Sequence, residues 1–379
     1  MNTQLDTERL KTDHLLVASF LFLAGLGLVT LYSSSYAIGP QRRLGDGLYF
    51  ITRQLAFGAG GMLLFFIASV IDLERLRKYM KPIVLITIIL CALTFVPGVG
   101  VSKNGAARWI GKIDSYTYQP SELVKLVLPL YLAHFFDKKQ NEINVLSKGI
   151  MPPVLITGVF VAIIIFQNNF STAVFLALNV LFVFFLAGVR YTYFISALVM
   201  FLPTAILLIL SKEHRVIRFR SFFNSGLDPQ GAGYQVRASV NSIVSGGFWG
   251  KGIGQGTRKI ASVPEIHSDF IFSAYAEELG FLGVFLFCIL FGVFAVRGYL
   301  VSMKNEKTFY RLLGCGLITM IISQVLLNIA VVAGALPATG IPLPFFSAGG
   351  SSLATTLAMV GLIMNVSRTS KTRVYERDV

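Results

Sequence analysis

The sequence predicts an all-α fold, a polytopic integral membrane protein with ten transmembrane helices. Hydrophobic residues make up 54% of the 379 residues and charged residues only 14%. The mean hydropathy is +0.69, and a soluble domain would be far more polar. Apolar runs of about 20 residues, enough to cross the hydrocarbon core, recur along the whole chain. Because backbone groups must be satisfied within lipid, these runs are expected to be helices rather than barrel strands.

Each of the ten apolar runs is expected to form one membrane-spanning helix. The fourth run is the weakest, because Glu122 and Lys125 lie in its first turns and Pro129 lies in its middle. The first run resembles a signal peptide, but it is longer than the usual apolar region of one and is expected to stay uncleaved. The runs cover residues 14–36, 48–71, 79–97, 120–136, 149–167, 170–188, 191–211, 269–296, 308–333 and 347–366.

The distribution of basic residues predicts that both termini are cytoplasmic. Lys and Arg are more frequent in the connections that this orientation places inside than in those it places outside, as the positive-inside rule requires. Residues 1–379 then form a single membrane domain. It has a cytoplasmic N-terminus at 1–13, a large extracytoplasmic loop at 212–268 between the seventh and eighth helices, and a cytoplasmic C-terminal tail at 367–379.

The net charge of +14 is explained mainly by this topology and by contact with anionic lipid head groups. Topology does not require the basic residues in the short outer loops, whereas an anionic lipid substrate at the outer face would account for them. Nucleic acid is not expected as a partner, because no basic stripe is interleaved with stacking aromatic residues. The outer basic residues are Arg42, Arg43, Lys103, Arg108 and Lys112.

Three polar segments stand out, at about 98–119, 212–268 and 334–346, and all three are predicted to lie outside. Loops longer than about 12–15 residues are usually functional or disordered, and the Gly, Trp, Tyr and Phe content of these segments argues against disorder. No soluble catalytic domain is visible. Any chemistry is therefore expected at the outer boundary of the membrane.

Asp269 is the leading catalytic candidate, because it lies where the long outer loop meets an apolar run. Ionisable groups at such a boundary are costly and are retained chiefly where they face a cavity. Asp269 could be a helix N-cap or a general base that accepts a proton from a substrate hydroxyl. On a continuous helix, Glu277 would lie roughly 12 Å deeper and about 80° around from Asp269. Glu277 is therefore expected to share the cavity, although a helix–helix hydrogen bond is the alternative.

The fourth run and the outer loop before it contribute further candidates. Glu122 and Lys125 are three residues apart and share one helix face, either as a buried structural pair or as cavity residues. Arg108 offers planar donors suited to phosphate. The glycine-rich stretch 246–257 could cradle phosphates through its amides or form a flexible re-entrant loop. The run 349–352 could line a crevice or permit close helix packing.

Taken together, these motifs resemble those of the SEDS family (shape, elongation, division and sporulation), which includes FtsW, RodA and SpoVE. The resemblance spans most of the chain. It rests on Asn104-Gly105-Ala106-Ala107-Arg108-Trp109-Ile110, Gln119-Pro120-Ser121-Glu122 with Lys125, Gly233-Tyr234-Gln235, the glycines and Lys251 of 246–257, Pro264-Glu265 with His267-Ser268-Asp269-Phe270-Ile271-Phe272, Glu277-Glu278 with Gly280, and Leu336-Pro337 through Gly349-Gly350-Ser351-Ser352.

The resemblance implies a peptidoglycan glycosyltransferase that polymerises lipid II, an undecaprenyl-diphosphate disaccharide-peptide, at the outer face of the bacterial cytoplasmic membrane. It implies Asp269 as the catalytic base. It also implies a class B penicillin-binding protein and other divisome proteins as partners, at the division septum. No cofactor is certain, and a divalent cation such as Mg²⁺ or Mn²⁺ could assist the leaving diphosphate. The candidate substrate-binding residues are Arg108, Glu122, Lys125, Lys251, Gln255, His267, Ser268 and Glu277.

The sequence departs from the family pattern in two places. Family members often have an acidic residue in a Pro-Asp turn, and this chain has Asn168-Asn169 there. Ala348 stands where tyrosine is usual, although Gly349-Gly350-Ser351-Ser352 favours the division branch over the RodA-type elongation branch. Two other functions remain open, a flippase or transporter of an anionic polyprenyl lipid and a structural division scaffold.

Overall fold

The computed structural model describes residues 13–36, 48–103, 105–111, 116–224, 231–256 and 267–369. Several sequence-based expectations therefore lie outside the described residues. These are the N-terminus before residue 13, the tail beyond residue 369, the outer basic residues Arg42, Arg43 and Lys112, and the motif positions Asn104, Pro264 and Glu265.

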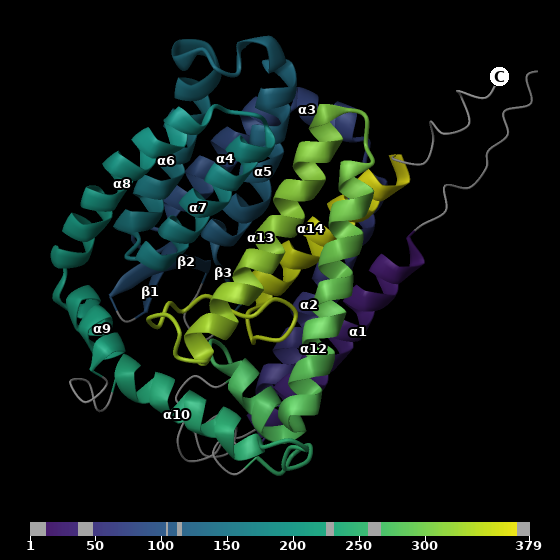
Figure 1. Ribbon diagram of the computed structural model, residues 1–379, viewed down its shortest axis with the longest axis vertical. Helices are drawn as coiled ribbons and strands as arrows, with labels where there is room; N and C mark the ends of the chain where they lie inside the picture. The colour runs from purple at the N-terminus through teal and green to yellow at the C-terminus, as the bar shows by residue number, and fades with distance from the viewer. Residues whose placement is uncertain are drawn as a thin grey trace, which may run out of the picture.

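A helix occupies each of the ten predicted positions, and the protein is an α-helical, multi-pass membrane protein (Figure 1). Seven of the described helices are long and apolar enough to cross a membrane, and Met80–Leu93 and Phe170–Leu186 are shorter apolar helices. The count of ten spans stays a prediction. The helices are α1 (His14–Tyr36), α2 (Tyr49–Val70), α4 (Met80–Leu93), α5 (Pro120–Lys138), α6 (Met151–Phe166), α7 (Phe170–Leu186), α8 (Tyr191–Leu210), α12 (Ile271–Met303), α13 (Thr308–Val332) and α14 (Gly350–Thr369).

The centre of the bundle is formed by α13 and α14, whose side chains are mostly buried. α14 packs along α2, and α13 contacts α5, α7 and α12. At the edge of the bundle, α8 has no buried side chain, and Figure 1 shows it outside the other helices. Its apolar residues therefore face lipid, where exposure of leucine and isoleucine is favourable.

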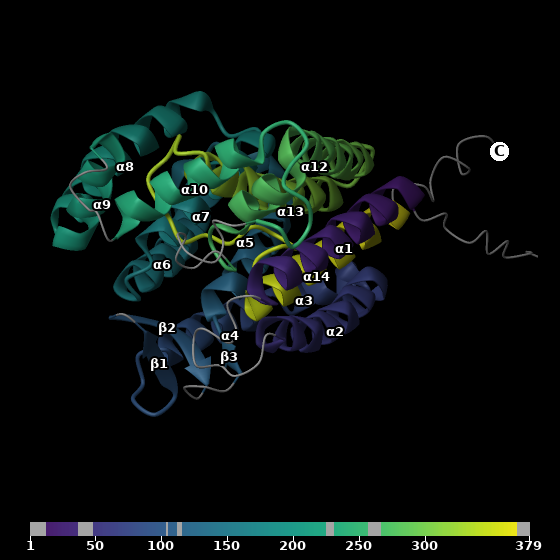
Figure 2. The same cartoon turned by 90° about the horizontal axis from the view of Figure 1, so that it is seen from below.

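The end of the bundle that is predicted to be cytoplasmic is held together by ion pairs. Arg77, in the short helix α3 (Leu73–Lys78), pairs with Asp137 on α5 and, over 3.0 Å, with Glu74. Lys307, just before α13, reaches the same Glu74 over 3.0 Å. The described parts of the three segments that are predicted to be external lie together at the opposite end (Figure 2).

Two of the outer segments contain regular structure that hydropathy did not predict. Segment 98–119 holds a three-stranded antiparallel sheet in the order β1 (Gly100–Lys103), β2 (Ala106–Gly111) and β3 (Thr117–Tyr118). Segment 212–268 holds the helices α9 (Glu213–Phe223) and α10 (Ala232–Gly246). Strands of two to six residues carry almost no periodic signal, so the sheet could not be found from sequence.

The glycine-rich segment after α10 forms hydrogen bonds with the backbone groups that are freed by a break in α12. At Gly280 (φ 62°, ψ −161°) the helix is interrupted, and the freed carbonyls of Glu277 and Glu278 accept the amides of Lys251 and Gly252, each over 3.0 Å. Two bonds run the other way, from Phe281 N to Gly247 O (2.9 Å) and from Leu282 N to Phe248 O (3.3 Å). These two loop amides are already bonded within the protein, so they do not form the phosphate cradle considered from the sequence.

Candidate functional site

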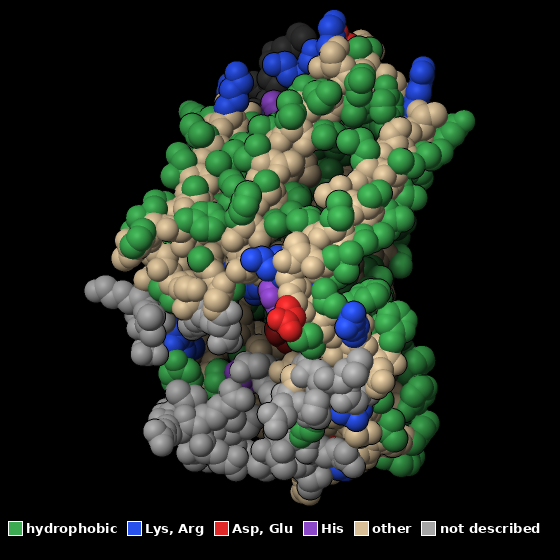
Figure 3. Space-filling model, turned by 90° about the vertical axis from the view of Figure 1, so that its left-hand side faces the viewer, with side chains coloured by type: hydrophobic (Ala, Val, Ile, Leu, Met, Phe, Trp, Pro, Cys, Tyr) green, Lys and Arg blue, Asp and Glu red, His purple; other side chains and the backbone are tan. Residues whose placement is uncertain are grey.

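A cavity of about 1410 Å³ opens at the end of the bundle that carries the sheet and α9. Its walls come from the first turns of α2, α5, α7 and α14, from β2 and α9, and from the segments 267–269 and 336–342. Figure 3 shows basic, histidine and acidic side chains gathered beside a hollow, below a broad apolar surface. Five of the nine residues selected from the sequence line this cavity, namely Arg108, Glu122, His267, Ser268 and Asp269.

Asp269 lies in a turn just before α12 and is partly exposed to the cavity. The N-cap residue of α12 is Phe270, so the structure does not support an N-cap role for Asp269. Gly340 (φ 71°) lies beside the carboxylate, and a Cβ at Gly340 would be 3.4 Å from Asp269 Oδ2. The glycine thus leaves room around the carboxylate. The neighbouring His267 is buried, and its ring centroid is 4.1 Å from that of Phe50 on α2.

Arg108 on β2 connects the sheet to the turn before α7. Its Nη2 donates to the carbonyl of Asn168, and its buried Nε has no acceptor among the described residues. Burial lowers the pKa of Arg108, the charge of Arg218 lowers it further, and the charge of Asp269 raises it. Arg108, Arg218 and Asp269 are therefore close enough to interact electrostatically. The buried Nε–H of Arg108 is available to donate to an anionic ligand.

The α9 helix supplies a basic wall that the sequence analysis missed. Lys212 is the N-cap residue of α9, and Arg215 and Arg218 follow it at every third position. The two arginines share one helical face, and this spacing was the signal that could have revealed them. All three line the cavity together with His214. Burial lowers the pKa of His214, and the neighbouring cations lower it further. Arg215 donates through Nη1 to Leu208 O over 2.7 Å, while its Nε has no partner among the described residues.

Glu122 lines the cavity, and Lys125 lies behind it as a buried counterion. Lys125 Nζ is 2.8 Å from Glu122 Oε1 and 3.0 Å from Gln324 Oε1 on α13. The lysine is 1% exposed and does not line the cavity. The structure thus combines the two interpretations of this pair, because Glu122 faces the cavity while Lys125 holds it in place.

Replacing Lys125 with methionine is expected to destabilise the protein by about 3–5 kcal/mol, because the carboxylate of Glu122 would remain buried without a counterion. Thermal unfolding in detergent would measure the loss. The Lys125→Met/Glu122→Gln double variant removes both charges and serves as the matched control. It should recover most of the lost stability, and an equal loss in both variants would contradict the ion-pair explanation.

Lys251, Gln255 and Glu277 do not line the cavity. Glu277 is fully buried, and its Oε1 is 2.8 Å from Lys251 Nζ, while Gln255 is exposed on the glycine-rich loop. The expectation for Glu277 assumed one continuous helix from Asp269. The helix instead begins at Ile271, so the spacing from Asp269 does not set the direction of Glu277.

Two further lining residues were not selected from the sequence. Arg53, in the first turns of α2, has its guanidinium 5.3 Å from the ring centroid of Tyr49 and 5.1 Å from that of Tyr116. Asn169 is buried at the start of α7, where the family pattern has an acid. Its amide makes the cavity of this chain less acidic than that pattern implies.

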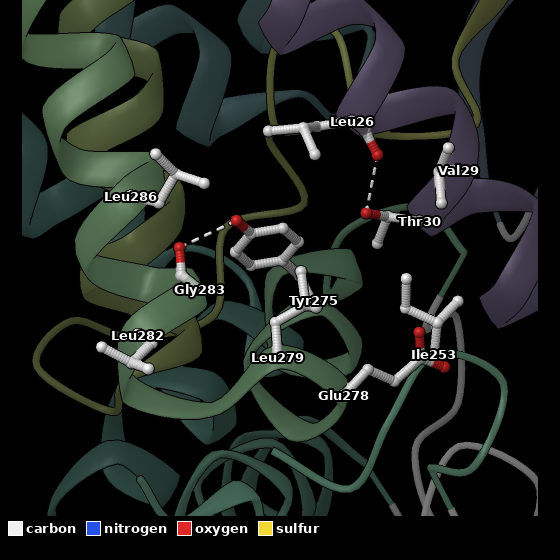
Figure 4. Close-up of a pocket in the computed structure, with 10 residues that line it drawn as sticks. All are labelled: Leu26, Val29, Thr30, Ile253, Tyr275, Glu278, Leu279, Leu282, Gly283 and Leu286. Atoms are coloured by element: carbon white, nitrogen blue, oxygen red, sulfur yellow. Dashed lines mark hydrogen bonds between the residues drawn. The ribbon is translucent and has the colours of Figure 1, made fainter. Parts of the chain in front are cut away.

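A second cavity, of about 330 Å³, lies between α1 and α12 and is mostly apolar (Figure 4). Its hydroxyl groups are satisfied within the protein. Tyr275 donates to Gly283 O and Thr30 donates to Leu26 O, each over 2.8 Å, and Glu278 accepts from Ser33 over 2.6 Å. This cavity therefore offers little to a polar substrate.

The donor set of the large cavity does not fit a dedicated divalent cation site. The acidic residues among its described lining are Glu122 and Asp269, and Glu122 is already paired with Lys125. The part of the chain that the structure describes contains no cluster of three or more His, Cys, Asp or Glu side chains placed to hold a metal ion.

Comparison with known proteins identifies the family. The sequence model of the FtsW, RodA and SpoVE family, described as "Cell cycle protein", matches residues 13–372. The chain belongs to the SEDS family. The resemblance found in its motifs is therefore confirmed.

Curated relatives match this SEDS protein over nearly its full length. It is 38% identical over 362 residues to the probable peptidoglycan glycosyltransferase FtsW of Borreliella burgdorferi, covering 95% of this chain and 97% of the relative. It is 34% identical over 355 residues to the protein of that name from Trichlorobacter lovleyi, covering 94% and 93%. It is 36% identical over 365 residues to stage V sporulation protein E of Bacillus subtilis, covering 96% and 99%.

Solved structures show the same fold as this SEDS protein. A chain from a structure titled "Structural coordination of polymerization and crosslinking by a peptidoglycan synthase complex" is 29% identical, with a TM-score of 0.79, and the match covers 95% of this chain and 99% of that one. The rod shape determining protein RodA of Thermus thermophilus is 27% identical, with a TM-score of 0.70 and coverage of 95% and 98%.

Proposed function

We propose that this SEDS protein is a peptidoglycan glycosyltransferase that polymerises lipid II at the outer face of the cytoplasmic membrane, with Asp269 as the general base. One observation carries the proposal. Asp269 shares a cavity with the arginines Arg108, Arg215 and Arg218, at the end of the bundle that is predicted to be external. The names of the curated relatives support the same activity.

In the proposed reaction, Asp269 takes part in one proton transfer. Its carboxylate accepts the proton of the 4-hydroxyl of the acceptor sugar as that oxygen attacks the anomeric carbon of the donor. A new glycosidic C–O bond forms, and the bond from the anomeric carbon to the phosphate oxygen breaks. The electron pair of the broken bond leaves with undecaprenyl diphosphate, so negative charge increases on the diphosphate.

Arginines are suited to stabilise that charge. Guanidinium groups bind phosphate in a planar, two-pronged geometry, and donors fixed in advance where charge develops are effective in catalysis. Arg108 and Arg215 each have a buried Nε–H without an acceptor among the described residues. We assign the diphosphate to the wall formed by β2 and α9, which leaves the sugar hydroxyl on the side of Asp269.

The decisive experiment supplies labelled lipid II to the purified protein, together with its class B penicillin-binding partner. Glycan strands are the expected product. Translocation of the lipid between leaflets without any polymer would instead support the flippase. The absence of both polymerisation and translocation would support the scaffold.

Replacing Arg218 with alanine is expected to weaken binding of the lipid-linked diphosphate by about 10- to 100-fold, because one charge-assisted contact is lost. Arg220 lies two residues further along α9 and does not line the cavity, so Arg220→Ala is the matched control. Titration with a fluorescent lipid II analogue at two salt concentrations measures both effects. Equal weakening in the two variants would contradict a specific role for the wall.

We further propose that the protein acts in the division branch of the family, at the septum. The Gly349-Gly350-Ser351-Ser352 motif and the FtsW names of several relatives support this assignment. A fluorescent fusion should gather at division sites, and depletion should give filaments. Uniform lateral localisation and rounded cells would favour the elongation branch.

A further inference from the structure

The turn that carries Asp269 has little structure of its own. Residues 267–270 form a turn, and the α-helix begins only at Ile271. A catalytic base must be held closely, since a misplacement of about 1 Å can cost a hundredfold in rate. The groups that hold this turn must therefore come from other parts of the protein.

Three successive carbonyls of the turn each accept a hydrogen bond from a distant segment. The carbonyl of His267 accepts from the amide of Ala348 over 2.8 Å, and that of Ser268 accepts from the hydroxyl of Ser347. The carbonyl of Asp269 accepts from Nδ2 of Asn328 on α13 over 2.9 Å. None of these three donors comes from α12, so α13 and the segment before α14 hold the backbone of residues 267–269.

Asn328 also bonds to the loop that flanks the carboxylate. Its Nδ2 donates to the carbonyl of Ile341 over 2.9 Å, next to Gly340, which borders Asp269 Oδ2. The buried amide of Asn328 thus fixes the backbone of Asp269 relative to the neighbouring loop. Asn328 is 1% exposed and does not line the cavity, so it cannot touch substrate in this arrangement.

We propose that Asn328, assisted by Ser347, is a positioning residue for Asp269. This inference rests on the proposed glycosyl transfer. Nδ2 supplies the hydrogens for both bonds, while Oδ1 has no partner among the described residues. The donor capacity of the amide, rather than its size, is therefore what the site uses.

The test compares Asn328 with a second asparagine of similar geometry. Asn365 on α14 is also buried, and its Nδ2 bridges two carbonyls, Ala68 O (3.0 Å) and Ile71 O (2.7 Å), at the far end of α2. Asn328→Leu and Asn365→Leu therefore remove the same kind of bridge from two places. The measurements are kcat and KM for lipid II polymerisation, and the melting temperature in detergent.

We expect Asn328→Leu to lower kcat by about 10- to 100-fold with KM within about twofold of the wild type. Asn365→Leu should lower the melting temperature similarly and leave kcat within about threefold. Asn328→Gln keeps the amide donors and should retain more activity than Asn328→Asp, which cannot donate when ionised. An unchanged kcat in Asn328→Leu, or an equal loss in Asn365→Leu, would overturn the proposal.

Two further measurements test the positioning role of Asn328. If Asn328→Leu does not fold, Ser347→Ala removes the neighbouring bond with a smaller change, and an unaltered kcat in that variant would refute the positioning role. Hydrogen exchange requires no activity. Asn328→Leu should speed deuterium uptake in 267–273 severalfold, and Asn365→Leu should not. Faster uptake without polymerisation by the wild type would refute the proposed function alone, whereas unchanged uptake would refute the positioning role.

Discussion

Replacing Asp269 with asparagine is expected to reduce lipid II polymerisation by about 10²- to 10⁴-fold, the range that a general base contributes. The amide has nearly the same shape as the carboxylate but cannot accept the proton of the attacking hydroxyl. The fall should appear in kcat, because the arginines that we assign to the diphosphate are unchanged. Single-turnover rates with labelled lipid II would separate this chemical effect from binding.

The control for Asp269 is Glu213→Gln, which removes an acid from the first turn of α9 that does not line the cavity. It should polymerise at the wild-type rate. Both variants should melt near the wild-type temperature, since neither change empties a packed site. If the asparagine variant kept more than a tenth of the wild-type kcat, Asp269 would not be the base.

Replacing Gly280 with alanine is expected to prevent normal folding. Gly280 has φ 62° and ψ −161°, a conformation that is essentially restricted to glycine and costs other residues about 1–3 kcal/mol. A Cβ there would also lie 2.3 Å from Gly250 N and 2.8 Å from Phe248 O. The loop could not remain docked on the broken helix, so the protein should lose yield and unfold at a much lower temperature.

Gly292 offers a matched control in the same helix. A Cβ at Gly292 meets nothing within 4 Å, and alanine is favoured over glycine within a helix by roughly 0.5–1 kcal/mol. Gly292→Ala should therefore be neutral or slightly stabilising. If Gly280→Ala were as stable as Gly292→Ala, the glycine-rich loop would not be a fixed part of the fold.

Much of this protein could be predicted from the sequence because the signals are local. Apolar runs long enough to span lipid placed all ten helices, since each satisfies its backbone within itself. Asp269, His267 and Ser268 were selected because they adjoin one such run, Glu122 because it lies in the first turns of another, and Arg108 because a guanidinium suits phosphate. The motifs also gave the family, which sequence comparison confirmed.

Other features depend on residues far apart in the chain, and only the tertiary structure decided them. Helix α12 begins only at Ile271, so helical spacing from Asp269 could not give the direction of Glu277, which pairs with Lys251 instead. The basic face of α9 lines the same cavity as Asp269, although the two are far apart in the sequence. Asn328 donates to the carbonyls of Asp269 and Ile341 because α13 packs beside both segments. Hydropathy reports the preference of each segment for lipid, whereas the direction of a buried polar group is set by the partner that satisfies it.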